Sequence, residues 1–343
     1  MKVVVPEPLF TEEATRKHPL MLWSLFDACL THGHELELAF DEQLAPSYLA
    51  WRSSLPIHAR ELVDLVVRVS LQSAARETVD RVVIATLDAT DWTASPPRLG
   101  PEELVALLHQ PLTILVEHEV NDGAFLKAVG FGFERDEFLK SVRKGRIRFD
   151  HAGGSSMRDL IKTRGQDRAR AHRMWAVFDS DALVPGAPSS EALEKGKACL
   201  SMGILHHMLH RRAIENYLPP DEIDEAMPHD HKDVARRKTM GAFRRLHATQ
   251  RAHYNLKGGF QGDQARLQPG GSDARHRPAV DALFSDVHVD ERVALAAGFG
   301  KDIAELFVVA PDKGRPGISE GRRRHDGQEA EMGPLFRAII RSL

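Results

Sequence analysis

Residues 112–123 read Leu-Thr-Ile-Leu-Val-Glu-His-Glu-Val-Asn-Asp-Gly, and this stretch decides the fold of the larger part of the chain. Its first five residues form a continuous, mainly apolar run, which is typical of a strand buried in a parallel sheet. The run ends in acidic residues that begin with Glu117. A helix is predicted over 123–129, so the segment has the form of a strand, an acidic turn and a helix.

Two later stretches, Arg146–Phe149 and Trp175–Phe178, are also predicted strands, and loop or helical sequence separates each from the next. Strands spaced in this way form βαβ units and a parallel sheet. The second stretch runs directly into Asp179-Ser180-Asp181. Because ligands bind outside the carboxyl ends of the strands in such sheets, we expect Glu117 and the two aspartates to converge there.

A third acidic motif is Arg211-Arg212-Ala213-Ile214-Glu215, which continues into Asn216-Tyr217-Leu218. Mg²⁺ is a hard cation that prefers oxygen ligands, and two such ions about 4 Å apart can drive phosphodiester hydrolysis. Because like charges raise each other's pKa, a cluster of carboxylates indicates a bound cation. The sequence therefore predicts a centre for two Mg²⁺ or Mn²⁺ ions, with candidate ligands Glu117, Asp122, Asp179, Asp181 and Glu215.

The order of these motifs resembles the Toprim domain of the OLD (overcoming lysogenization defect) nucleases, to which Toprim effectors of anti-phage systems are related. The resemblance covers roughly residues 110–260 and includes Asp150-His151-Ala152-Gly153-Gly154-Ser155. In that family the strand-end Glu, the Asp-x-Asp pair and the Glu of a Glu-Asn-Tyr motif bind divalent metals beside a Gly-Gly turn. The resemblance implies these roles for Glu117, Asp179, Asp181 and Glu215, and for the turn at Gly153-Gly154.

The chain departs from the family at two points. The family commonly has Glu-Gly, with a second acid four residues after the Glu. In this chain His118 replaces the Gly and Asn121 replaces the second acid, while Asp122 follows one residue later. Glu119 and Asp122 are therefore alternative ligands. The OLD proteins also carry an ATPase, but this chain has no Gly-x-x-x-x-Gly-Lys-Ser/Thr loop, which implies control by a separate ATPase sensor protein.

Four of the candidate residues have simpler interpretations. The family uses a Lys late in the domain, and Lys257 is the expected catalytic counterpart, able to stabilise charge developing on a phosphate, although it could be a plain loop lysine. The Asp-Ser-Asp motif could be a turn or a helix cap. Glu215 could instead form an ion pair with Arg211 or Arg212 on a helix.

The histidines offer a weaker signal. His206 and His210 lie four residues apart in a stretch with helical character, a spacing that can bind zinc. Surface histidines, or histidines that support a neighbouring site, are the alternative.

The chain is predicted to divide into an N-terminal α/β domain over 1–100, a Toprim domain with a helical extension over 108–310 and a flexible segment over 311–330. The Pro-, Gly- and Ser-rich stretch 91–101 is the expected linker. Expected N-terminal elements are strands at 2–5 and 34–40 and helices at 19–31 and 59–71, while 80–86 is either another strand or the start of a buried helix. Farther along, the sequence predicts a helix-like block over 191–212, loop over 255–290 and a helix over 291–307.

The N-terminal domain faintly resembles a PIN-type nuclease domain, through Phe40-Asp41-Glu42-Gln43 and the following Pro46-Ser47-Tyr48. That family needs an Asp at the end of its first strand, where this chain has Pro6 and Glu7 after Val5. The resemblance therefore implies an inactive, structural domain. A helical recruitment or oligomerisation domain is the alternative, and it would make the protein a homo-oligomer.

Composition is that of an ordinary globular protein, with 343 residues and a net charge of −3. Only Cys29 and Cys199 occur, and we find neither a signal peptide nor an apolar run of membrane-spanning length, so we expect a cytoplasmic protein without membrane or disulfide framework. Basic clusters that could attract a polyanion, or simply be solvated, lie at 140–148, 211–212, 236–238, 244–245 and 322–324.

Taken together, these features predict a metal-dependent endonuclease that hydrolyses phosphodiester bonds in nucleic acid, DNA rather than RNA, as an effector of anti-phage defence. The alternative is a catalytically decayed Toprim protein that acts as a regulatory or scaffold partner. The missing acid at position 121 favours the alternative, whereas the order of the acidic motifs favours the enzyme.

Overall fold

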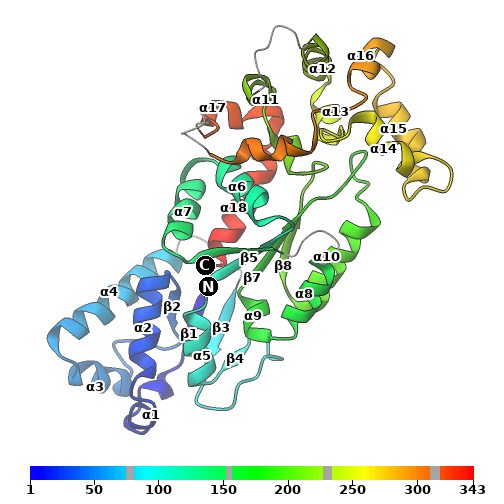
Figure 1. Ribbon diagram of the computed structural model, residues 1–343. Coiled ribbons are helices and arrows are strands. Elements are labelled where there is room, and N and C mark those ends of the chain that lie inside the picture. The colour runs from blue at the N-terminus through cyan, green and yellow to red at the C-terminus, as the bar shows by residue number, and fades with distance from the viewer. Residues whose placement is uncertain (75–80, 152–156, 227–233, 310–316) are drawn as a thin grey trace.

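The computed structural model describes residues 1–74, 81–151, 157–226, 234–309 and 317–343 (Figure 1). It contains two four-stranded sheets, in which neighbouring strands pair in parallel and which helices flank. The predicted α/β class is therefore confirmed at this level. Among the described helices, none combines the length and apolar composition needed to cross a membrane.

The N-terminal sheet has the strand order β2-β1-β3-β4. Its strands are β1 (Lys2–Val5), β2 (Glu35–Leu38), β3 (Val82–Ala85) and β4 (Arg98–Leu99). The helices predicted at 19–31 and 59–71 are confirmed as α2 (Met21–His32) and α4 (Ile57–Ala74). Residues of both helices and of β1 are buried together in one hydrophobic core, which supplies the stability of this unit.

Helix α5 (Pro101–Leu108) also belongs to the N-terminal unit. Its residues Leu104, Leu107 and Leu108 are buried in the core that contains β1 and α2, and β4 adds Leu99 to the same core. The stretch expected to be a linker therefore includes residues of the first sheet. The N-terminal unit reaches residue 108 instead of ending at 100.

The second sheet has the order β6-β5-β7-β8. Its strands are β5 (Leu112–Val116), β6 (Ile147–His151), β7 (Met174–Phe178) and β8 (Leu205–Met208). All residues of β5 and β7 are buried, as their continuous apolar sequences predict. The chain adds β6 on one side of β5 and then β7 and β8 on the other, so the strand order reverses between β5 and β7.

Helices cover both faces of the second sheet (Figure 1). One face packs against α6 (Glu119–Val129), α7 (Gly132–Arg143) and α18 (Glu329–Arg341). The other face packs against α8 (Met157–Gly165) and α10 (Ser190–Met202). The end of α18 is tied to the base of β7, because the indole nitrogen of Trp175 donates a hydrogen bond of 2.9 Å to the Ser342 hydroxyl.

Residues 191–212 do not form the single helix-like block that the sequence predicts. Helix α10 ends at Gly203, whose φ of 68° is the left-handed conformation that commonly terminates helices. Strand β8 follows, and successive side chains of a strand point to opposite faces. The interpretation of His206 and His210 as two histidines on one helix is therefore wrong, and His206 stacks on Phe178, on the face that α10 covers.

The C-terminal part is more helical than predicted. The expected loop over 255–290 contains α14 (Gly259–Leu267) and α15 (Arg277–Leu283). The expected helix over 291–307 is divided into α16 (Val289–Ala294) and the 3₁₀ helix η5 (Lys301–Phe307), because Gly298 and Gly300 between them have positive φ. Of the predicted flexible segment, 317–330 contains α17 (Glu320–Arg323), and 311–316 lies outside the described residues.

Candidate metal centre

The edge of the second sheet where β5 and β7 end carries the predicted acids. Glu117 follows β5 and Asp179 follows β7, the strands between which the strand order reverses. That reversal opens the crevice in which open α/β sheets bind ligands. Burial and four neighbouring negative charges raise the pKa of Asp179 well above its ordinary value; these charges belong to Glu117, Glu215, Asp122 and Asp181. The structure thus places the five predicted acids near enough to one another for four of their charges to act on Asp179.

The segment that carries Glu215 is fastened to the end of β7 by hydrogen bonds. The backbone amide of Ile214 donates to Asp179 Oδ1 over 3.0 Å, and the amide of Asp181 donates to the carbonyl of Arg212 over 2.8 Å. Asp181 itself has a left-handed φ of 52°, which marks a sharp turn. The Asp-Ser-Asp motif is therefore a turn, as the simpler interpretation holds, and this turn also holds η3 (Ile214–Tyr217) beside Asp179.

Two buried arginines hold this segment from its other side. Arg212 forms a two-pronged ion pair with Asp263, at 2.7 and 2.6 Å, and both residues are buried. Arg211 donates to the carbonyl of Asn216 over 2.7 Å and lies over the ring of Tyr217. In the structure Glu215 forms its ion pair with Lys257, so the alternative pairing with Arg211 or Arg212 is wrong.

Glu117 has a partner that the sequence did not reveal. The ammonium of Lys195, on α10, lies 2.6 Å from Glu117 Oε1 and 3.1 Å from a Glu191 oxygen. Burial raises the pKa of Glu117, and the charge of Lys195 offsets only part of that rise. Glu191 and Lys195 are spaced as an ordinary exposed helix pair, so the sequence offers no signal that Lys195 is buried at the sheet edge.

The structure distinguishes the two rival acids after β5. Asp122 Oδ2 accepts hydrogen bonds of 2.9 Å from the amides of Glu117 and His118, which fixes the turn that leaves the strand. Burial raises the pKa of Asp122, and its charge acts on Asp179 and Lys257. Glu119 is exposed and points instead to His151, 3.1 Å from its Nδ1 atom. Asp122 is therefore the acid that belongs to the cluster.

Lys257 reaches the cluster from a tight loop. Its ammonium lies 3.2 Å from Glu215 Oε2, and although burial lowers the pKa of Lys257, the charges of Glu215 and Asp179 outweigh that effect and raise it. The loop is closed at Gly259, where φ is +59° and a Cβ atom would lie 2.3 Å from the carbonyl oxygens of Leu295 and Ala296. Only glycine fits there, so the position of Lys257 is fixed by backbone packing.

The donor set fits a hard divalent cation. Glu215 is buried, and within the described part of the chain its Oε2 atom has the Lys257 ammonium, 3.2 Å away, as its ion-pair partner. The side chain of Glu117 is 22% exposed, so the cluster is open to solvent beside it. Carboxylate oxygens in a partly enclosed group are the ligands that Mg²⁺ and Mn²⁺ prefer.

The carboxylate oxygens of this acidic cluster are not arranged as a ready-made set of metal ligands. Among the described residues, one group of three has ligand atoms all within 4.8 Å of one another, and it is His207, His210 and Glu331. In the acidic cluster, Lys195 and Lys257 hold Glu117 and Glu215 in ion pairs. Binding of a cation would therefore have to displace these ammonium groups. The predicted turn at Gly153 and Gly154 lies outside the described residues.

Several basic residues that suggested an anion-binding surface are ion-paired. Arg244 contacts Asp221 and Asp224, and Arg322 contacts Glu222 and Glu225. These pairs hold α11 (Pro220–Ala226) against its neighbours. They reduce the positive charge that a polyanion would meet on this part of the surface.

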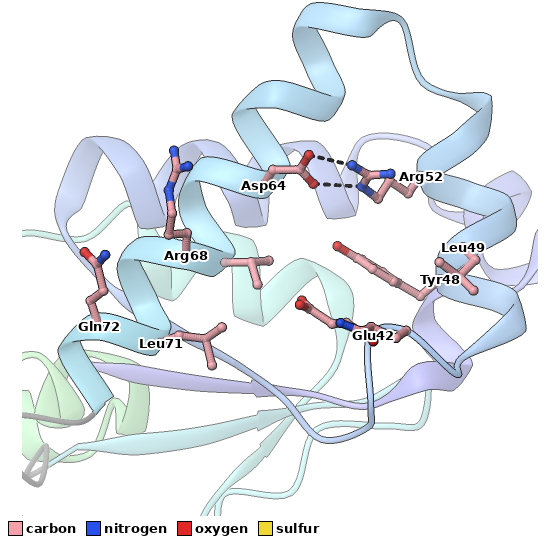
Figure 2. A pocket seen from close by; sticks show the side chains of 10 residues that line it. Glu42, Tyr48, Leu49, Arg52, Asp64, Arg68, Leu71 and Gln72 are labelled. Atoms are coloured by element: carbon pink, nitrogen blue, oxygen red, sulfur yellow. Dashed lines mark hydrogen bonds and ion pairs between the residues drawn. The ribbon is translucent and has the colours of Figure 1, made fainter.

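The N-terminal unit has a cavity of about 810 Å³ away from the acidic cluster (Figure 2). Figure 2 shows Arg52 and Asp64 joined across it, with Tyr48 and Glu42 facing them and Arg68 farther along α4. Burial raises the pKa of Tyr48 to about 12, so its phenol stays neutral. At the end of β1, Glu7 accepts a hydrogen bond from the amide of Ser47, so this acid caps α3 (Pro46–Ser54).

Comparison with known proteins gives no relative for this chain. No model of a protein family matches it, and no curated protein or solved structure is significantly similar to it. A proposal for its function therefore rests on the residues and geometry of the sheet edge.

Proposed function

We propose that the protein is a metal-dependent nuclease of the Toprim type, which hydrolyses phosphodiester bonds in nucleic acid, DNA rather than RNA. The single observation that carries this proposal is the convergence of acids around Asp179 at the point where the strand order reverses. Such a cluster is costly without a cation, so its presence at a ligand-binding edge supports metal binding. An effector role under a separate ATPase is part of the same proposal.

Each residue has a role in this proposal. Mg²⁺ or Mn²⁺, bound as two ions, would supply Lewis acidity and a water activated at neutral pH. The residues that would hold them are Glu117, Asp122, Asp179, Asp181 and Glu215. Lys257 would donate a hydrogen bond to a phosphate oxygen, since its ammonium is half-buried and already lies beside Glu215. Arg212 keeps the loop of Asp181 in place through its carbonyl group.

Cleavage should depend on the metal and on Glu117. We expect the full chain to cut plasmid and linear DNA, and tRNA less, with Mg²⁺ or Mn²⁺, and to cut nothing in the presence of a chelator. Glu117→Gln keeps the shape of the side chain but removes its charge, so the rate should fall at least about 100-fold, the scale of losing one strong electrostatic contact. Gel assays measure the rates, and equal rates for both proteins contradict the proposal.

Lys257→Met should lower the cleavage rate about 100-fold or more, because the methionine fills the space without a charge to stabilise the phosphate. Divalent metal binding should be retained or strengthened, since Glu215 loses its competing partner. Lys301→Met is the matched control, because Lys301 is exposed at the start of η5. If both variants cut at the rate of the unmodified protein, Lys257 is a plain loop lysine.

One observation favours the alternative, a decayed Toprim protein that serves as a regulatory or scaffold partner. Lys195 and Lys257 already neutralise Glu117 and Glu215, and internal lysines that replace the metal would make the cluster stable without it. The two functions differ in a measurable property, since a decayed site would take up no Mn²⁺. In a catalytic site, the metal cation would replace the ammonium groups of Lys195 and Lys257 beside the carboxylates.

A further inference from the structure

A second group of potential metal ligands lies on the other side of β8 from α10. His207 pairs with Val177 across the sheet and faces the core that α18 covers. Glu331, in the first turn of α18, is 7% exposed and meets His207 there. His210 follows two residues after β8 and completes the group. Three residues separated by up to 124 positions in the chain thus share one place.

The distances within this group suit a tetrahedral metal ion. His207 Nε2 lies 2.8 Å from Glu331 Oε1, and His210 Nδ1 lies 3.7 Å from Glu331 Oε2. Zinc bonds to nitrogen and oxygen are about 2.0–2.1 Å long, so neighbouring ligands around one tetrahedral ion are about 3.3 Å apart. The two observed separations end on different oxygens of Glu331, and one ligand atom from each of the three residues lies within 4.8 Å of the other two. Side-chain movements of about an ångström would bring one oxygen and both nitrogens to the tetrahedral spacing.

The carboxylate of Glu331 is already held in place by other groups. The hydroxyl of Tyr217 donates to Oε2 over 2.5 Å, and the backbone amide of His210 donates to Oε1 over 2.8 Å. Supporting hydrogen bonds of this kind orient metal ligands. Among the described residues, the ion pairs of Glu331 are to His207 and His210, so no lysine or arginine competes for its oxygens.

We propose that His207, His210 and Glu331 form a zinc site with three protein ligands and a water in the fourth position. Two imidazoles and one carboxylate suit zinc, whereas Mg²⁺ prefers oxygen ligands alone. The side chain of His210 is 72% exposed, so both the ion and the water can enter. The proposal does not depend on the nuclease function, because none of these ligands belongs to the acidic cluster.

This zinc site would join the edge strand β8 to the C-terminal helix α18. The chain runs from His210 directly into Arg211 and Arg212, which hold the segment beside Asp179. Bound zinc would therefore stabilise the second sheet and the position of that segment. Without zinc, the same three side chains remain joined by hydrogen bonds and ion pairs.

The test is metal titration of the full chain after its metals have been removed. We expect the unmodified protein to bind one equivalent of Zn²⁺ by calorimetry, to show the absorption of tetrahedral Co²⁺, and to melt at a higher temperature with Zn²⁺. His210→Ala should weaken Zn²⁺ binding more than about 100-fold, since even supporting groups contribute 10- to 100-fold. Its fold should be retained because His210 is exposed.

Two controls make the result specific. His206→Ala removes a histidine on the opposite face of the same strand and should bind Zn²⁺ unchanged. Asp179→Asn impairs the acidic cluster and should also retain the zinc site. Absence of Zn²⁺ uptake by the unmodified protein, or equal affinity in His210→Ala, overturns the proposal and leaves a hydrogen-bonded junction between β8 and α18.

Discussion

Asp179→Asn is expected to reduce metal-dependent cleavage at least about 1000-fold, the largest effect of any single substitution in the acidic cluster. The charges of the other four acids act on Asp179, and Asp179 also accepts the hydrogen bond from the Ile214 amide that holds the segment of Glu215. Asparagine has the same shape but binds divalent cations weakly, and the loss combines weaker metal binding with lost transition-state stabilisation. Single-turnover cleavage over a range of Mn²⁺ concentrations measures it.

Asp290→Asn is the matched control, because Asp290 has 92% of its side chain exposed and lies in α16. It should cut at the unmodified rate. Cleavage by Asp179→Asn within tenfold of that rate would falsify the placement of the catalytic metal at this sheet edge.

The same substitution has a predicted effect on stability when metal is absent. The pKa of Asp179 is higher in the folded chain than in the unfolded chain, so its stabilising contribution is present at acidic pH and is lost as pH rises through the folded value. Near neutral pH the carboxyl of Asp179 therefore lowers the unfolding free energy of the metal-free protein. We expect Asp179→Asn to raise the metal-free Tm by about 2 °C or more at pH 7, and added Mn²⁺ to narrow that difference.

Arg212→Ala is expected to cost about 3–5 kcal/mol of unfolding free energy, because it removes the cation that pairs with the buried charge of Asp263, to which the Asn255 amide still donates a hydrogen bond. The substitution also frees the segment around position 212, whose carbonyl accepts a hydrogen bond from the amide of Asp181. Metal binding should therefore weaken as well. Urea unfolding followed by circular dichroism measures the change. The double variant Arg212→Ala with Asp263→Ala should recover part of the loss, since no unpaired charge remains.

Arg244→Ala supplies the comparison for this prediction. Arg244 also contacts two carboxylates, but its side chain is 47% exposed, so water replaces the lost contacts. Exposed pairs of this kind contribute about 1 kcal/mol or less. If Arg212→Ala costs no more than Arg244→Ala, burial of the Arg212–Asp263 pair is not what secures the segment.

The parts of the fold that could be predicted are those with a local signal. Strands β5 and β7 have continuous apolar sequences, and each ends in an acid, so both the strands and the convergence of Glu117 with Asp179 followed from the sequence. Strand β8 reads Leu-His-His-Met and is only half-buried at the sheet edge, so it has no apolar run to reveal it. Helix α18 does have a local signal, because its buried residues Met332, Leu335, Phe336 and Ile339 follow a helical spacing, although Pro334 lies inside it.

The contacts that could not be predicted join residues far apart in the chain. Lys195 meets Glu117 across 78 positions, and Arg212 meets Asp263 across 51. Glu331 meets Tyr217 across 114 positions. Such pairs depend on how whole helices pack against the sheet, and no periodicity in one sequence specifies them. The resemblance to the Toprim family also stays a prediction, because its motifs specify the order of residues along the chain and not their arrangement in space.

The central claim, that the acids around Asp179 bind divalent cations, is tested most directly by calorimetric titration with Mn²⁺. The titration uses full-length His210→Ala, so that the histidine site contributes nothing, with and without Asp179→Asn. We predict uptake of two ions by the first protein and affinity at least about 100-fold weaker in the second. Absence of uptake in both, or equal uptake in both, contradicts the claim and favours a cluster that Lys195 and Lys257 neutralise permanently.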